Sequence, residues 1–231
     1  MTVPGKGIYL RSLRNHGTPA GVARYLRDAG FDAALLHINA NKESDLKRYS
    51  AALFESVQLG LYATPEAFKP EKYMRTLDRM TSLLRSIPGI DWIFANPEVG
   101  WNKAKPSEAR ALTDNTVEAA VCCESAIVTY PAHRFAKTWA SPMSIGSCEV
   151  YDRNNDQGPG FSKKWISRWE KYGYFEIQPS LAGWNKTPDQ MRRYLRSQPP
   201  VERVWFWITK LPAGPVLDLI RKYDPMHPEK L

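Results

Sequence analysis

Three glutamates lie where short apolar runs of the sequence end or are interrupted by polar residues. Glu98 closes the run DWIFANPE, Glu149 lies within SIGSCEVYD, and Glu176 lies within YFEIQPS. Runs of this length and composition are typical of buried strands. A carboxyl group held on such a strand can donate a proton, accept one, or attack as a nucleophile. Glu98, Glu176 and Glu149 are therefore the candidate catalytic residues.

The segments that would position these glutamates alternate between short β-rich runs and longer amphipathic runs. The β-rich runs predict strands over 7–12, 31–39, 58–64, 91–98, 126–132, 144–152, 174–180 and 201–209. Helical spacing of apolar residues predicts helices over 18–30, 43–57, 71–89, 107–125, 162–173, 187–198 and 214–224, with a short irregular segment around 134–143. Strands that alternate with helices pair in parallel, and eight such units are what a closed barrel requires. We therefore predict an α/β fold, a single (β/α)8 TIM-type barrel domain over residues 1–231.

An open, doubly wound sheet is the alternative architecture for this alternation. Its Gly-rich phosphate-binding turn would follow the first strand, whereas Gly-Lys-Gly at 5–7 precedes it here. The barrel is therefore the favoured interpretation.

Side chains along a barrel strand alternate between the lumen and the surrounding helices. This alternation places Phe175 against the helices and the following residues in the lumen: Tyr9, Ser147, Tyr174, Ser180 and Trp205. By the same parity, Glu98, Glu149 and Glu176 point inward from the fourth, sixth and seventh strands. Because barrel enzymes build their active sites at the carboxyl ends of the strands, we expect the three glutamates to converge there.

Further polar and aromatic side chains are predicted at the same rim. Aromatic rings there can stack on the apolar faces of sugars, and neutral polar groups can bind sugar hydroxyls. The alternatives are simple packing for the aromatic residues, a hydrogen-bonded core position for His37, and a buried ion pair between Glu176 and Arg11. The predicted substrate-binding residues are Arg11, His37, Asn39, Tyr62, Asn96, Trp101, Tyr130, Tyr151, Asp152, Gln178, Trp184 and Trp207.

Carboxylates among aromatic rings and neutral hydrogen-bonding groups suit glycoside hydrolysis. Other reaction classes lack their motifs: the sequence has no GxSxG, no HExxH and no P-loop. No lysine falls inside a predicted strand, where a Schiff base would form, and Lys210 lies just beyond the last one. We predict no cofactor and no metal ion.

The chain resembles glycoside hydrolases with a barrel fold, on the evidence of two strands. A glutamate that ends the fourth strand close behind an Asn, as Glu98 follows Asn96, resembles the acid/base of the large retaining clan, although Pro97 intervenes here. Glu176 on the seventh strand is similar in place to the nucleophile of that clan. The resemblance implies a glycan substrate.

The chain also resembles the barrel-fold muramidases of phages and bacteria. That family carries a catalytic glutamate at the end of the fourth strand, which matches Glu98, and further acidic residues on the rim, which Glu149 or Asp152 would supply. Its first strand bears an Asp, whereas this chain has Arg11 and Ser12 at that place. The resemblance implies a substrate in the bacterial cell wall.

Three hypotheses about function follow. The first is a glycan-hydrolysing enzyme with Glu98 as general acid/base and Glu176 or Glu149 as nucleophile or stabiliser. The second is a catalytically inactive barrel that binds a glycan or serves as a structural module, which the departure at Arg11 favours. The third is a metal-dependent barrel enzyme, with ligands drawn from His37, Glu98, His133, Glu149 and Glu176.

The protein is basic, with 32 Lys and Arg against 24 Asp and Glu and an isoelectric point of about 9.4. This excess favours an anionic partner, and an anionic cell-wall polymer fits better than nucleic acid because the basic residues are dispersed. The three cysteines predict no disulfide framework and no structural zinc. The oligomeric state stays open.

No apolar stretch reaches the roughly 18–20 residues that a membrane span needs, so we expect a soluble protein. The N-terminal sequence MTVPGKGIYLRSLRN shows no secretory signal. We expect a cytoplasmic protein, or one that is released or virion-associated by a route not encoded at the N-terminus.

Overall fold

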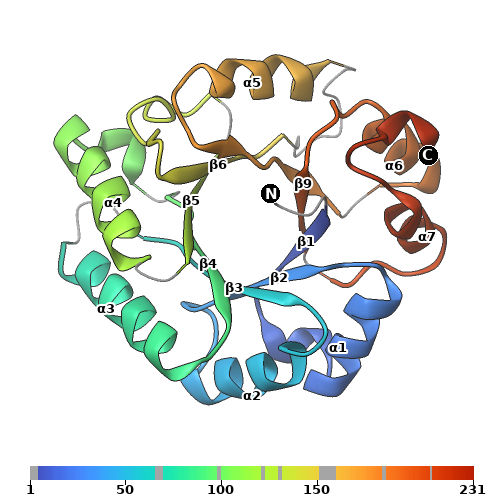
Figure 1. Ribbon diagram of the computed structural model, residues 1–231, viewed down its shortest axis with the longest axis horizontal. Coiled ribbons are helices and arrows are strands. Elements are labelled where there is room, and N and C mark those ends of the chain that lie inside the picture. The colour runs from blue at the N-terminus through green and yellow to red at the C-terminus, as the bar shows by residue number, and fades with distance from the viewer. Residues whose placement is uncertain are drawn as a thin grey trace.

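In the computed structural model, nine parallel strands form one sheet in the order β7-β6-β5-β4-β3-β2-β1-β9-β8. The structure describes residues 5–65, 70–97, 100–120, 123–129, 132–150, 160–183, 186–208 and 210–231. Figure 1 shows the strands at the centre and the helices in a ring around them. The strands are β1 Gly5–Leu10, β2 Ala33–His37, β3 Gln58–Ala63, β4 Ile90–Ala95, β5 Glu124–Thr129, β6 Ser144–Cys148, β7 Glu176–Ile177, β8 Ser180–Ala182 and β9 Arg203–Trp207.

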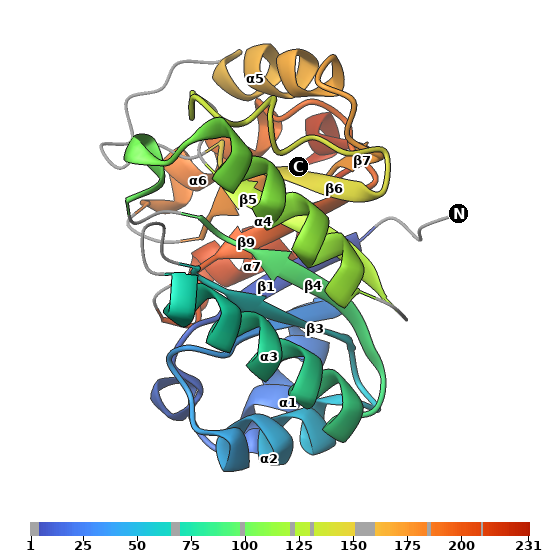
Figure 2. The same cartoon turned by 90° about the vertical axis from the view of Figure 1, so that its left-hand side faces the viewer.

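Each α-helix follows a strand along the chain and packs outside the barrel, and 3₁₀ turns precede α1 and α4 (Figure 1). Figure 2, turned by 90°, shows α3 and α4 in front of the strands. Within the described ranges, no helix is both long and apolar enough to cross a bilayer. The helices are α1 Pro19–Asp28, α2 Glu43–Leu53, α3 Pro70–Ser86, α4 Pro106–Ala119, α5 Phe161–Glu170, α6 Pro188–Arg196 and α7 Gly214–Lys222, with short 3₁₀ turns at Leu13–His16, Trp101–Lys103 and Pro228–Lys230.

The seventh predicted strand is split into two pieces that close the barrel. β7 pairs with β6, and β8 pairs with β9. Between them, the Gln178 amide donates to the Gly146 carbonyl at 3.0 Å on one side, and the Trp205 amide donates to the Pro179 carbonyl at 2.9 Å on the other. A parallel bridge between Glu149 and Ser180 joins the two edges. Since β7 and β8 together act as one interrupted strand, the (β/α)8 TIM-type prediction is confirmed.

The buried side chains fall into two clusters, as the predicted alternation requires. Tyr9, Trp92 and Trp205 belong to a compact cluster inside the barrel, whereas their neighbours Ile8 and Phe206 belong to the larger cluster under the helices. The other members of the inner cluster are Ala33, Leu35, Tyr62, Phe94, Ala126, Val128 and Ile145, with Trp207 packed against it. The inward face of most strands was therefore predicted correctly.

Glycines make room for the large rings inside the barrel. A Cβ atom built on Gly7 would lie 2.1 Å from the Trp205 ring, and one built on Gly60 would lie 2.3 Å from Leu35. Barrel interiors are filled in layers, so a bulky residue on one strand needs a small one on its neighbour. The close packing of Trp205 thus depends on the absence of a side chain at Gly7.

The alternation fails at the start of the seventh strand. Tyr174 was predicted in the lumen, but its ring stacks on Trp169 with centroids 5.3 Å apart, and its hydroxyl donates to the Ala136 carbonyl at 2.8 Å. Phe175, predicted against the helices, is 67% exposed. Both predictions are wrong because β7 begins only at Glu176, so the preceding residues lie in a turn that strand parity does not govern.

Candidate functional site

Five of the predicted site residues lie at the C-terminal end of the barrel. His37 and Trp207 are the last residues of β2 and β9, and Tyr62 lies one residue before the end of β3. Asn96 and Glu149 follow directly after β4 and β6. Asn96 is 1% and Glu149 4% exposed, although both are polar. A buried polar cluster at this end is where a barrel enzyme would place its reactive groups.

Three hydroxyl groups lie beside Glu149 in the lumen. The Tyr9 hydroxyl lies 3.0 Å from Ser180 Oγ and 3.4 Å from Ser147 Oγ, and the two serine oxygens are 2.8 Å apart. Burial raises the pKa of Tyr9 well above its usual value, and the Glu149 carboxylate adds to the rise. The tyrosine therefore stays protonated at neutral pH and remains able to donate a hydrogen bond.

The inward position of these three hydroxyl groups was predicted from the sequence, but their place in the candidate site was not. The strand alternation placed Tyr9, Ser147 and Ser180 inside the barrel, but none was proposed as a site residue. The signal was in the sequence, since each shares its inward face with a proposed residue on the same strand: Arg11, Glu149 and Gln178.

An aromatic chain connects His37 to these hydroxyls. The His37 ring stacks on Tyr62 with centroids 4.4 Å apart, and its Nε2 hydrogen-bonds to Thr64 Oγ1 at 2.9 Å. The Tyr62 ring in turn meets the rings of Tyr9 at 5.2 Å and Trp207 at 5.8 Å. His37 is thus a buried, hydrogen-bonded histidine that also belongs to the C-terminal mouth of the barrel, the end where His37, Tyr62, Asn96, Glu149 and Trp207 lie.

Burial holds two histidines neutral at physiological pH. It lowers the pKa of His37 to about 4, with Arg11 contributing, and lowers that of His133 to about 4, with Arg134 contributing. In the unfolded chain, both should titrate near the ordinary value of about 6.5.

Acidification from pH 6.5 to 4 is therefore expected to reduce the free energy of unfolding. Between pH 6.5 and 4, His37 and His133 are protonated in the unfolded chain but largely neutral in the folded protein. The free energy of unfolding therefore rises with pH across this window and decreases as the pH falls. Urea unfolding at several pH values should show a shallower pH dependence of the free energy of unfolding in His37→Gln, by about 2–3 kcal/mol across the window. The exposed His227→Gln is the control, and an unchanged slope in His37→Gln would contradict the prediction.

Glu176 and Arg11 do not form the ion pair that was considered as the alternative to a catalytic role for Glu176. Arg11 lies exposed after the C-terminal end of β1, whereas Glu176 is the first residue of β7 and so lies at the N-terminal end of the barrel. Burial raises the pKa of Glu176, and the nearby carboxylates of Glu202 and Glu124 raise it further. The expected convergence of Glu176 with Glu149 at the C-terminal rim is wrong, because the strand begins later than the pattern suggested.

Replacement of Glu176 by Gln is expected to leave the free energy of unfolding at pH 7 unchanged or to increase it. When the pKa of a carboxyl group is raised in the folded state, the protein loses stability as the pH rises and the group becomes charged. The Gln amide carries no charge, so this loss does not occur in the variant. Chemical denaturation at pH 7, with the exposed Glu118→Gln as control, measures the difference. A loss of more than about 1 kcal/mol would indicate a stabilising ion pair instead.

Arg203 occupies the N-terminal end of the lumen. Its guanidinium group, 1% exposed with the rest of the residue, donates to Asp32 Oδ1 at 2.6 Å and to Gln58 Oε1 at 3.3 Å. It also lies 5.2 Å from the centre of the Trp92 ring and 5.7 Å from that of Trp205. The carboxylates at this end therefore serve to surround a buried cation.

The remaining described site residues have structural partners. The Trp101 indole donates to the Pro65 carbonyl at 2.8 Å. Gln178 Oε1 accepts from the Trp205 indole at 2.8 Å inside the barrel. Asn39 Oδ1 accepts from the Thr64 amide at 3.0 Å at the rim. Five predicted residues lie outside the described part of the chain: Glu98, Tyr130, Tyr151, Asp152 and Trp184.

The described members of the ligand set in the metal-dependent hypothesis are not brought together. His133 stacks on Trp139 at 4.5 Å outside the lumen, Glu176 lies at the N-terminal end, and His37 lies at the mouth. Nowhere in the described ranges do three His, Cys, Asp or Glu side chains gather where they could hold a metal ion.

A lysine does lie within a strand, contrary to the prediction. Lys6 is the second residue of β1, and its ammonium group donates to the carbonyls of Ile220 and Arg221 at the end of α7, at 2.9 and 2.8 Å. Burial lowers its pKa to about 8. Because this group points into the helix layer, it does not face the lumen where a Schiff base would form.

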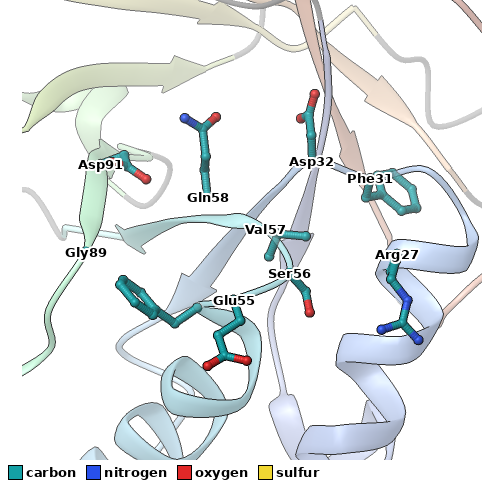
Figure 3. A pocket seen from close by; sticks show the side chains of 10 residues that line it. Arg27, Phe31, Asp32, Glu55, Ser56, Val57, Gln58, Gly89 and Asp91 are labelled. Atoms are coloured by element: carbon teal, nitrogen blue, oxygen red, sulfur yellow. The ribbon is translucent and has the colours of Figure 1, made fainter.

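Two pockets mark the two ends of the barrel. One of about 490 Å³ lies at the N-terminal end, among the turns that precede β2, β3 and β4. Figure 3 shows Asp32, Glu55, Asp91 and Arg27 around it. The other, of about 260 Å³, lies at the C-terminal end between β2, β3 and α3, close to His37. Its Lys72 and Arg75 were not foreseen, since they come from a helix and not from a strand end.

No family model matches the chain, and no curated protein matches it either. Solved structures do share its fold. A GH30 endoxylanase from Clostridium papyrosolvens C71 is 12% identical, with a TM-score of 0.63 over 98% of this chain and 74% of that one. A GH18 chitinase from Pseudoalteromonas aurantia is 9% identical, with a TM-score of 0.61 over 88% and 93%. Dihydrodipicolinate synthase from Agrobacterium tumefaciens is 13% identical, with a TM-score of 0.59 over 99% and 76%. The chain therefore has the barrel fold that glycoside hydrolases share with other enzymes.

Proposed function

We propose that this protein hydrolyses glycosidic bonds at the C-terminal mouth of its barrel. The observation that carries the proposal is the placement of Glu149, a carboxylate 4% exposed, directly after β6 and beside the hydroxyl cluster of Tyr9, Ser147 and Ser180. A charge is expensive to bury, so a carboxylate kept at the functional end of a barrel points to a chemical role. The structural likeness to an endoxylanase and a chitinase supports the same reaction class.

Glu98 is the partner of Glu149 in this proposal. In the sequence Glu98 comes two residues after the buried Asn96, which directly follows β4 at the end of the barrel that also carries Glu149. Glu98 gives a proton to the leaving oxygen, and Glu149 either attacks the anomeric carbon or activates water. The Tyr9, Ser147 and Ser180 hydroxyls hydrogen-bond to one another close to Glu149 and give the carboxylate a polar surrounding.

The other side chains of the mouth bind the sugar. Trp207 is partly exposed and offers a ring face, and the neutral His37 and Asn96 offer hydrogen bonds to hydroxyl groups. The formal net charge of +8 favours a glycan that carries negative charge, for which an anionic bacterial cell-wall polymer is the leading choice. Glu176 has no part in the reaction, since it lies at the other end of the barrel.

The proposal is tested by incubating the protein with cell-wall preparations and with a panel of neutral and anionic soluble glycans, then separating the products by chromatography. Release of new reducing ends is the expected result. Binding without any product would favour the alternative of a catalytically inactive glycan-binding barrel, and neither binding nor product would contradict both.

A further inference from the structure

In the described part of the chain, the exposed large apolar side chains all lie at the end of the barrel opposite the mouth. They are Phe54, Met143, Phe175 and Met226. The first three lie in the turns that precede β3, β6 and β7. Met226 lies beside the turn that precedes β9, since the neighbouring Pro225 carbonyl accepts from the Val201 amide at 3.0 Å. A single exposed apolar residue is ordinary, but their collection at one end of the barrel is typical of an interaction surface.

Met143 and Phe175 are neighbours at this end. Met143 directly precedes β6, and the Phe175 amide donates to the carbonyl of Ser144, the first residue of that strand, at 3.0 Å. Met143 is 70% and Phe175 67% exposed. Backbone hydrogen bonding therefore holds two large apolar residues next to each other at the edge of the barrel, where both are open to solvent.

The pocket of Figure 3 lies at the same end. Its volume of about 490 Å³ is within the range of about 300–1,000 Å³ that binding pockets usually have. Phe54 belongs to its lining, and a Cβ atom built on Gly89 would lie 2.1 Å from the Phe54 ring. Figure 3 shows that the carboxylates of Asp32, Glu55 and Asp91 come from three separate segments around it. The pocket thus combines an apolar ring with carboxylates.

The accessible charges at the starts of the described strands are negative, although the formal net charge of the protein is +8. The basic residues at or next to the first residue of a described strand, Lys6 and Arg203, are both buried. The acidic residues at such positions are at least partly exposed: Asp32, Asp91, Glu124, Glu176 and Glu202. Arg27, the basic residue in the pocket lining, lies 3.6 Å from the Asp28 carboxylate. This end of the barrel therefore attracts positive charge.

Two of these carboxylates are hydrogen-bonded by neutral donors. Asp91 accepts from a backbone amide of β3 at 3.3 Å, and Glu124 accepts from the Trp92 indole at 2.8 Å. Such bonds fix the direction of the carboxylates but leave their negative charge in place. Asp32 differs, since the Arg203 guanidinium donates to it at 2.6 Å. Asp91 and Glu124 are therefore better placed than Asp32 to bind a cation from outside.

One extended peptide segment is long enough to contact both apolar parts of this end. β4 and β5 separate β3 from β6 in the sheet, so the turns before β3 and β6 are three strand spacings, or about 14 Å, apart along the sheet. Asp91 on β4 and Glu124 on β5 lie between these turns. Seven extended residues span about 20 Å, and every second side chain faces the same side. Apolar side chains at the two ends of such a segment and basic ones between them match this order.

We infer that the end of the barrel opposite the mouth binds a protein segment in which basic residues are flanked by large apolar ones. The binding surface is formed by Phe54, Glu55, Asp91, Glu124, Met143 and Phe175. Its carboxylates repel nucleic acid and anionic membranes, which carry negative charge themselves. A two-fold contact with a second copy of the chain would place the same carboxylates against each other. The inference does not depend on the proposed function, because the surface lies at the other end of the barrel from Glu149.

The test measures the fluorescence anisotropy of labelled seven-residue peptides with blocked ends. The probe has Phe at both ends, Lys at the third and fifth positions and Ser elsewhere. One comparison peptide has Glu in place of Lys, and the other has Ser in place of Phe. We expect saturable binding of the probe with a dissociation constant below about 1 mM, and binding of both comparison peptides that is weaker by about tenfold or more.

Two variants locate the binding surface. Glu55→Gln/Glu124→Gln should weaken binding of the probe by about threefold or more, since Gln keeps the acceptor for the Trp92 indole but not the charge. Met143→Ser/Phe175→Ser should weaken it by about tenfold. Both pairs lie at exposed positions, so the variants are expected to fold, and circular dichroism checks this. Added salt should weaken binding to the wild type more than to Glu55→Gln/Glu124→Gln.

The control variant Glu43→Gln/Asp189→Asn makes the same change in net charge at exposed positions in the first turns of α2 and α6, at the other end of the barrel. It should bind the probe like the wild type. The inference is overturned if the probe does not bind saturably, if either comparison peptide binds equally well, or if neither surface variant weakens binding. Self-association of the wild type in sedimentation experiments that is lost in Met143→Ser/Phe175→Ser would show an interface between copies and would also overturn it.

Discussion

Glu149→Gln is expected to lower kcat on a hydrolysed glycan by a factor of about 10²–10⁴, the usual worth of a positioned carboxyl group in acid–base chemistry. Gln keeps the shape of the side chain beside Tyr9 and Ser180, but it can neither attack the sugar nor accept a proton from water. KM should change little, since the sugar contacts of Trp207 and His37 remain. Initial rates over a range of substrate concentrations give both constants.

Glu98→Gln should lower kcat by a similar factor, because the two carboxyl groups act on the same glycosidic bond. The double variant should lose little more than either single variant, since groups that act as a unit are not additive. Glu118→Gln on the exposed face of α4 is the matched control and should keep full activity. Circular dichroism and melting curves check that each variant is folded. If the purified and folded Glu149→Gln variant had the kcat of the wild type, Glu149 would have no part in the mechanism.

Arg203→Met is expected to reduce the free energy of unfolding at pH 7 by about 2–4 kcal/mol. Removal of one partner from a buried ion pair typically costs about 3–5 kcal/mol. The lower range applies here because the Asp32 side chain is 41% exposed and can turn to water. Gln58 would lose a charged donor, and Glu176 would lose the cation that offsets its raised pKa.

The deficit of Arg203→Met should shrink as pH falls toward 4, where the surrounding carboxyl groups take up protons. Arg203→Lys should lie between the variant and the wild type, since it keeps the charge but not the planar fork of donors. Arg192→Met, which breaks an exposed 3.4 Å pair with Asp189, is the control and should cost less than about 1 kcal/mol. Denaturant titrations at pH 7 and pH 4.5 measure all four proteins. Equal losses in Arg203→Met and the control would show that the buried cation contributes little.

Local patterns explain why the architecture was predictable. The period of two along a strand and the helical spacing between strands are properties of short segments, so β3 and α2 could be located within a few residues. The same period places Tyr62 and Trp205 inside the barrel whatever the rest of the chain does. The positions of His37, Asn96 and Glu149 at the C-terminal end of the barrel were predicted correctly, because each comes at the carboxyl end of a strand whose limits were clear.

The amino-acid sequence by itself determined the barrel, the inward face of most strands and the presence of polar residues at one rim. Only the tertiary structure decided the height of each side chain along the barrel axis. A pattern of period two gives the face of a residue, but the height depends on where hydrogen bonding to the neighbouring strands begins. Pairing of the seventh strand starts at Glu176, which leaves this carboxylate beside Arg203 at the far end from Glu149. The pocket of about 260 Å³ was equally beyond local reasoning, since Thr64 and Arg75 line the same space only when α3 packs near the ends of β2 and β3.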